Sequence, residues 1–240
     1  MASGIGEKPL SFYARIAGIS ILLTGATAIF ANIFVMGGLI VPDDAAATAT
    51  NISGNDLLFR FGVLGFLIVF LLDLVVAWAL YILMKQLNKR VALLATFFRL
   101  VYSASSSAAL FHFLNISQLV NDADSLGITE SDQVNIEVML SINAVNNAWS
   151  IGLVFFAVHL FVLGYLIVKS GFIPKVLGTL LMLAGLGYFI DNITWVLLSD
   201  YAASMAVLAL LVLVLGIIAE LAFAIWLLAK GKNLSGNEFH

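Results

Sequence analysis

The chain has 240 residues, of which 62% are hydrophobic and 10% are charged, with a net charge of −3 and no cysteine. An average soluble domain is about 45–50% apolar and about 25% charged, so this composition excludes an ordinary water-soluble fold and indicates an integral membrane protein. The lack of cysteine excludes disulfides and cysteine nucleophiles. The sequence has no basic tract, which argues against a nucleic-acid partner.

Six apolar segments are long enough to cross a membrane, which takes about 20 largely apolar residues. These predicted spans are residues 14–40, 59–84, 91–115, 146–168, 176–199 and 204–229. The first segment exceeds the apolar stretch of about 7–15 residues in a signal peptide, so we interpret it as an uncleaved span. The sequence therefore predicts an all-α protein, a bundle of six transmembrane helices in one membrane domain that covers residues 1–240.

Turn-forming residues separate consecutive spans at two places. The polar run from Gln86 to Arg90 predicts a short turn between the second and third spans. Between the fourth and fifth spans, Gly171 predicts the end of one helix and Pro174 the start of the next. Both connections are therefore expected to be short.

Two longer segments are predicted to form the outer loops. Residues 41–58 are rich in Ala, Thr, Asn and Asp, which indicates a polar surface loop. In residues 116–145, Thr129 and Asp132 resemble a capping box, and apolar residues then recur at every fourth position. This pattern predicts that the fourth helix begins outside the membrane and continues into it. A disordered loop is the alternative.

The basic residues predict the orientation of the chain. In a six-span arrangement, nine of the eleven Lys and Arg residues fall in joints on one side: Lys8, Arg15, Lys85, Lys89, Arg90, Lys169, Lys175, Lys230 and Lys232. The joints on the other side carry acidic residues and no Lys. The positive-inside rule therefore places both termini in the cytoplasm, in a protein of the cell membrane.

Apart from residues at the span ends, six acidic, basic or histidine residues lie inside the predicted spans, where a charge costs about 2.5–3.5 kcal/mol at the membrane centre on insertion scales. They are Asp73, Arg99, His112, His159, Asp191 and Glu220. Because a Leu or Ile returns only about 0.3–0.6 kcal/mol, these side chains are expected to face the interior of the bundle and to find partners there.

Four of these residues are predicted to form one layer across the bundle. They are Asp73, Arg99, His159 and Glu220, on the second, third, fourth and sixth spans. At a helical rise of about 1.5 Å per residue, all four fall on the cytoplasmic side of their span centres. Asp191 and His112 fall in the outer half of the membrane instead.

Polar and small residues line one face of the third span. This face carries Arg99, Tyr102, Ser103 and Ser106 at helical spacing. The run Ala104–Ala109 is uniformly small, which allows close helix packing or leaves room for a ligand or water. On the fifth span, Tyr188 shares a face with Asp191. The candidate intramembrane polar site therefore consists of Asp73, Arg99, Tyr102, Ser103, Ser106, His159, Asp191 and Glu220.

Structural interpretations of the same residues stay open. Asp73 and Arg99 can form a buried ion pair that fixes the register of two helices. His159 can be a neutral interior histidine that bonds a backbone carbonyl or Glu220. A metal site is not expected, because the membrane histidines number only two and lie at different depths. No cofactor is predicted, and no known motif of catalytic chemistry is present.

The sequence also resembles the membrane protein family known as domain of unknown function 4386. The resemblance rests on Gly38–Pro42, Asp44–Ala49, Asn51–Ile52, Phe97–Leu100, His159–Leu160, Gly164–Ile167, Lys169–Lys175, Gly187–Asp191, Glu220 and Trp226–Gly231. It extends over nearly the whole chain. It implies a helical bundle in a bacterial or archaeal cell membrane, and it implies no particular activity.

Three functional hypotheses follow. The first is a polar pocket between the helices, with a small molecule or a proton as ligand, used in transport or sensing. The second is a structural or partner-binding subunit whose buried charges only hold helices together. The third is an intramembrane hydrolase or transferase acting on lipids, with His159 as the base. Whether the protein is an enzyme stays open. The lipid bilayer is an expected partner, a small molecule or a proton is a possible ligand, and the sequence predicts no oligomeric state.

Overall fold

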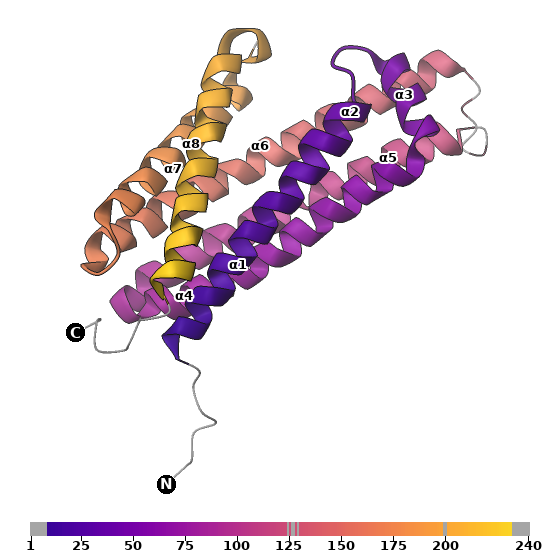
Figure 1. Cartoon of the computed structure of the whole chain (residues 1–240). Helices are drawn as coiled ribbons and strands as arrows, with labels where there is room; N and C mark the ends of the chain where they lie inside the picture. Colours follow the sequence, from indigo (N-terminus) through magenta and orange to yellow (C-terminus); the bar gives the residue numbers. More distant parts are fainter. Residues whose placement is uncertain (1–8, 124, 126–127, 129, 199–200, 232–240) are drawn as a thin grey trace. The chain divides into compact units, whose positions relative to one another are not determined.

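The computed structural model describes residues 9–123, 125, 128, 130–198 and 201–231. These residues form helices joined by short connections, and no strand occurs among them (Figure 1). The all-α prediction is therefore confirmed. Within the described part, five helical stretches are long and apolar enough to cross a membrane.

The first apolar stretch begins with α1 (Leu10–Ile29), continues as the π-helix η1 (Phe30–Met36) and ends with α2 (Gly37–Leu39). A short helix follows it, α3 (Ala45–Gly54), in the segment that was expected to be a loop. The Asp44 carboxylate accepts a hydrogen bond of 2.8 Å from the backbone N–H of Ala47 and thereby caps α3. The run of alanines behind this cap favours helix over loop, so residues 41–58 are largely helical rather than irregular.

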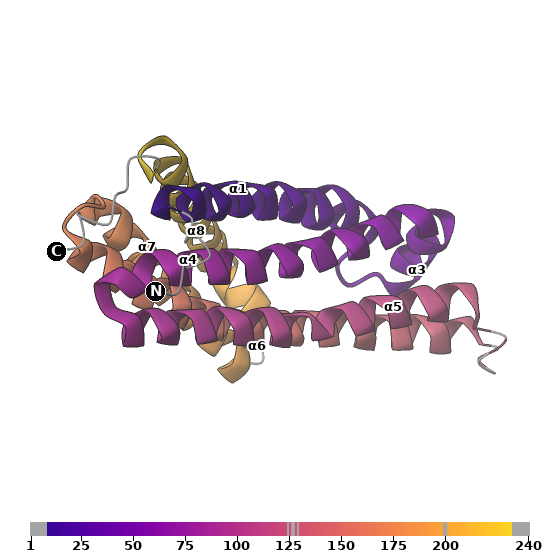
Figure 2. The same cartoon turned by 90° about the horizontal axis from the view of Figure 1, so that it is seen from below.

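The second apolar stretch, Asp56–Asn121, contains two antiparallel helical arms. It comprises α4 (Asp56–Ser106) and α5 (Ala108–Asn121), and α4 is broken at Asn88, whose φ of −154° and ψ of 105° are not helical. The Asn88 side chain accepts hydrogen bonds of 3.1 Å from the backbone N–H groups of Arg90 and Val91. It thus caps the start of the second arm, and the chain reverses direction there, as the polar run predicts (Figure 2).

Three long helices complete the chain: α6 (Ser131–Ser170), α7 (Lys175–Leu197) and α8 (Tyr201–Ala229). Gly171 has a φ of +78°, a conformation that favours glycine, and Pro174 directly precedes α7. The predicted stop and restart is therefore confirmed. The start of α6 at Ser131 agrees with a fourth helix that begins well before its apolar part. Thr129 of the predicted capping box lies outside the described residues.

The chain divides into two compact units. Unit 1 contains the described residues of Met1–Leu23, Leu72–Ser103 and Leu153–His240, and unit 2 contains those of Thr24–Leu71 and Ala104–Gly152. The helices α1, α4 and α6 each contribute residues to both units, whereas α7 and α8 belong to unit 1 and α3 to unit 2.

Glycines set the close packing of α6 on α7 in unit 1. A Cβ atom added to Gly164 would lie 2.5 Å from the carbonyl oxygen of Gly178, and one added to Gly178 would lie 2.6 Å from that of Gly164. The two backbones are therefore in contact. Small residues allow this close approach. Membrane helices depend on such packing because the hydrophobic effect does not drive their association in lipid.

Aromatic rings fill the core of unit 2. Phe113 of α5 stacks on Phe66 with a centroid distance of 5.6 Å and meets Phe59 edge-on at 5.9 Å. Trp149 of α6 meets Phe66 at 4.8 Å. These ring contacts join both arms of the α4–α5 stretch to α6 without any buried ion pair among the described residues of this core.

Candidate functional site

The arms of α4 bring Asp73 and Arg99 into contact within unit 1. The Arg99 Nε–H donates a hydrogen bond of 3.0 Å to Asp73 Oδ1, and Arg99 Nη2 donates to the same oxygen. The two residues are 26 positions apart, which a continuous helix would separate by about 39 Å. Their contact therefore depends on the reversal at Asn88. The side chains are only 2% exposed, so the pair is sealed from its surroundings.

His159 of α6 is bound at both ring nitrogens. Its Nδ1 lies 2.9 Å from the backbone oxygen of Ala95, and its Nε2 lies 3.1 Å from Arg99 Nη1. A carbonyl oxygen can only accept and a guanidinium can only donate. The geometry therefore assigns the proton to Nδ1 and leaves Nε2 as the acceptor, so His159 is a neutral histidine that supports Arg99.

Glu220 of α8 completes the group from a fourth helical segment. Its Oε1 lies 3.6 Å from Arg99 Nη1, the nitrogen that also faces His159. This distance is within ion-pair range but longer than a direct hydrogen bond. The Glu220 side chain is 27% exposed, against 2% for Arg99. Glu220 is thus the loosest and most accessible member of the set Asp73, Arg99, His159 and Glu220, which we call the charged cluster.

One positive and two negative groups meet in the charged cluster. With His159 neutral, Arg99 carries the single positive charge, and both Asp73 and Glu220 are carboxyl groups. If both are ionised, the cluster has a net charge of −1. An unbalanced charge is costly in a membrane interior. Binding of one proton by a carboxyl group would make the cluster neutral.

An aromatic side chain that the sequence analysis did not single out lies beside the cluster. Phe156 of α6 presents its ring to Arg99, with Cζ 5.4 Å from the ring centroid. Tyr102 and Tyr188 pack against the same ring at centroid distances of 4.7 and 5.9 Å. Phe156 precedes His159 by three positions, so helical spacing from His159 was the signal that could have found it.

The other predicted site residues are divided between unit 1 and unit 2. Tyr102 and Ser103 are buried in unit 1 on the arm that carries Arg99, and Asp191 is half-buried on α7. Ser106 belongs to unit 2, where its side chain packs against Gly152. The Ser106 hydroxyl is buried and has no hydrogen-bond partner. Ser106 therefore belongs to a different unit from Arg99, Tyr102 and Ser103.

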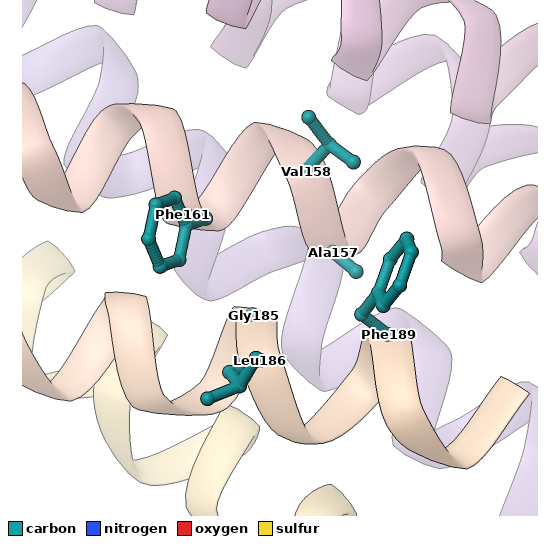
Figure 3. A pocket seen from close by; sticks show the side chains of 6 residues that line it. All are labelled: Ala157, Val158, Phe161, Gly185, Leu186 and Phe189. Carbon is teal, nitrogen blue, oxygen red and sulfur yellow. The ribbon is translucent and has the colours of Figure 1, made fainter. Parts of the chain in front are cut away.

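A pocket in unit 1 lies between α6 and α7 and is wholly apolar. Its lining consists of Ala157, Val158, Phe161, Gly185, Leu186 and Phe189 (Figure 3). No side chain of the charged cluster lines it. Among the residues that the structure describes, no three His, Asp or Glu side chains lie close enough together to hold a metal ion.

Comparisons with known proteins place this chain among relatives. The family model described as "Domain of unknown function (DUF4386)" matches residues 16–231, which include the whole charged cluster. An uncharacterized protein of Archaeoglobus fulgidus is 30% identical over 175 residues, which are 73% of this chain and 86% of that relative. No solved structure matches the chain significantly. The chain therefore belongs to the DUF4386 family, as its sequence resemblance predicts.

Proposed function

We propose that the chain crosses the cell membrane six times with both termini in the cytoplasm, and that its charged cluster serves proton-linked transport or sensing through Glu220. The antiparallel arms of the Asp56–Asn121 stretch support six crossings, because each arm exceeds the roughly 20 residues that a span needs. The separation of charge supports the orientation. The joints at residues 85–90 and 169–175 are basic, whereas those between α2 and α3 and before α6 are acidic.

The observation that carries the proposal is the contrast between Glu220 and its partners. Asp73 is 1% exposed and receives two N–H groups of Arg99, so a proton on Asp73 would displace a strong interaction. His159 is 1% exposed and has both nitrogens occupied. The Glu220 side chain is 27% exposed, and its contact with Arg99 is long. Glu220 is the member whose protonation changes the fewest contacts.

A proton on Glu220 would change how α8 is held. The ionised carboxylate attracts Arg99 and so ties α8 to α4. The protonated group loses that attraction, while Asp73 and His159 continue to hold Arg99. Such a switch acts through one local electrostatic contact on an element with two arrangements. We therefore expect α8 to respond to pH and the rest of the charged cluster to stay in place.

This proposal is narrower than the hypothesis of a polar pocket that binds a small molecule, because it involves only a proton at Glu220. Three of the four side chains are sealed, and the pocket beside α6 and α7 is apolar. A soluble polar substrate therefore has no support at the charged cluster. The enzymatic hypothesis has none either, because a base needs a free lone pair and Nε2 of His159 is occupied by Arg99.

A structural role is the second candidate. It is favoured by the sealing of Asp73, Arg99 and His159, which form a closed hydrogen-bonded group between two helices. In that case Glu220 would serve only to complete the packing. The two candidates differ in whether Glu220 exchanges a proton in the folded protein.

Infrared spectroscopy of the purified protein in lipid tests this difference. We expect a carboxylic C=O stretching band that grows as the pH is lowered and that is absent from Glu220→Gln. The matched control is Glu137→Gln, which removes a half-buried acid of unit 2 and should leave the band unchanged. A wild-type spectrum without a pH-dependent band assigned to Glu220 would reject the proposal in favour of the structural role.

A further inference from the structure

The apolar pocket between α6 and α7 has a closed floor and exposed side chains around it. A Cβ atom added to Gly185 would lie 2.6 Å from the carbonyl oxygen of Ala157, so the two helix backbones are in contact at the floor. Phe161, Leu186 and Phe189 flank this contact (Figure 3), and each of them is at least 41% exposed. Small residues beside large ones therefore create the hollow.

The size, lining and position of the pocket fit a hydrocarbon chain. Its volume is about 160 Å³, and no polar side chain lines it. Apolar cavities of about 150 Å³ stay dry and take up apolar molecules. Leu186 is the middle residue of α7 (Lys175–Leu197), and Ala157 is the middle residue of the predicted span 146–168. At the middle of a membrane the surrounding molecules are the ends of lipid acyl chains.

Both helices carry a lysine at the end where they connect. Lys169 follows Ala157 by 12 positions, and Lys175 precedes Leu186 by 11 positions. At about 1.5 Å per residue these separations are about 18 Å and about 17 Å, close to half of a hydrocarbon core that is about 30 Å thick. A pocket at the centre of the bilayer therefore places both lysines at the depth of the lipid headgroups.

Exposed side chains of α6 connect the pocket with this end. Phe161, Tyr165 and Lys169 follow one another at intervals of four positions, which is about one helical turn, and all three are exposed. Lys169 Nζ lies 6.0 Å from the centroid of the Tyr165 ring. Neither Lys169 nor Lys175 forms an ion pair with a carboxylate in the part of the chain that the structure describes. Their charges are therefore free to bind an anion.

We propose that this face of unit 1 binds one anionic phospholipid, with the end of an acyl chain in the pocket and the phosphate on Lys169 and Lys175. Each ammonium group donates hydrogen bonds to phosphate oxygens. A neutral phospholipid can place a chain in the pocket, but it gains less from the two lysines because it has no net negative charge. The lipid site lies apart from the charged cluster and shares with the proposed function only the crossing of the membrane.

Photolabelling of the full chain in lipid vesicles tests this site. The anionic probe is phosphatidylglycerol with a diazirine near the end of one acyl chain, and the neutral probe is phosphatidylcholine with the same chain. Mass spectrometry of peptides locates the label after illumination. At low probe concentration we expect the anionic probe to label the pocket about 30-fold more strongly than the neutral one, which corresponds to about 1 kcal/mol from each lysine.

Removal of the two lysine charges should abolish this preference. Lys169→Gln combined with Lys175→Gln should bring labelling by the anionic probe down to the level of the neutral probe, because the pocket stays and the phosphate loses both partners. The matched control is Lys89→Gln combined with Arg90→Gln, which removes the same charge from the other basic connection and should keep the preference. All four side chains are exposed, so both double variants should fold.

Removal of one ring beside the pocket should weaken labelling by both probes. Phe161→Ala makes this change, and its control is Phe111→Ala, which removes a 73% exposed ring of α5 in unit 2. Equal labelling by the two probes, or a pocket labelled no more than the exposed Leu210 and Leu211 of α8, would overturn the proposal. Either result leaves the infrared band of Glu220 as evidence for the proposed function, and absence of that band would leave the lipid site intact.

Discussion

Units 1 and 2 join the two arms of the α4–α5 stretch through different kinds of contact. In both units, the two arms of the α4–α5 stretch lie antiparallel and are joined by a polar contact. In unit 2, Ser117 and Asn121 donate hydrogen bonds of 2.8 Å to Asp56 Oδ1, while stacked aromatic rings fill the core. In unit 1, the contact is the sealed pair of Asp73 and Arg99.

The difference indicates that buried charge is not required to hold these arms together. In unit 2 the buried core between the arms is aromatic, and the charged group of the polar contact, Asp56, is partly exposed. A buried ion pair is often no more stabilising than apolar residues of similar volume, whereas loss of one partner is strongly destabilising. Apolar residues such as Phe and Leu could therefore stabilise the packing of unit 1 about as well as its charges do. This points to a task for the charged cluster beyond packing.

The largest effect is expected from removal of the single positive charge of the cluster. Arg99→Met leaves the carboxyl groups of Asp73 and Glu220 without a counter-charge and should lower the free energy of unfolding by about 3–5 kcal/mol. Thermal unfolding in detergent measures this loss. Arg99→Met combined with Asp73→Asn and Glu220→Gln should recover much of it. Failure of the triple variant to recover would show that the shape of Arg99, rather than its charge, holds unit 1.

An intermediate effect is expected in the aromatic core of unit 2. Phe113→Ala removes one ring from contacts with Phe59 and Phe66 and should destabilise the protein by about 3 kcal/mol. Because the described core of unit 2 contains no ionisable pair, this loss should be the same at acidic and neutral pH. Thermal unfolding at both pH values measures it. A loss of stability that varied strongly with pH would contradict the contrast between the aromatic core of unit 2 and the charged cluster of unit 1.

The smallest effect is expected from the polar contact of unit 2. Asp56→Ala leaves Ser117 and Asn121 without their shared acceptor and should cost about 1 kcal/mol, because Asn121 keeps a second bond to the Ser117 carbonyl oxygen. The matched change in unit 1, Asp73→Ala, should cost clearly more. Equal losses in the two variants would remove the contrast between the units.

The grouping of four ionisable side chains could be predicted from the sequence, but the direction of a side chain around its helix could not. The rise per residue is nearly constant, so Asp73, Arg99, His159 and Glu220 could be assigned to one layer, and the structure brings these four side chains into contact. Direction depends on packing between helices. Ser106 shares a helix face with Arg99 in sequence, yet it packs in unit 2 against Gly152.

Three further features had weak signals in the sequence or none. Helix α3 was missed because polar residues outweighed the helix-forming run of alanines behind Asp44. Phe156 was missed because an aromatic residue in an apolar span looks like any lipid-facing residue until a cation is found over its ring. The contact of Tyr188 with Gly216 is a tertiary feature that no sequence period reveals.

The most direct test of the central claim is a pair of high-resolution structures in lipid, one at acidic and one at alkaline pH. The account predicts that Asp73, Arg99 and His159 keep the same hydrogen bonds in both structures. It also predicts that the Glu220 carboxylate lies close to Arg99 at alkaline pH and withdraws from it, together with α8, at acidic pH. An identical position of Glu220 at both pH values would contradict proton exchange at this residue and leave the charged cluster with a structural role.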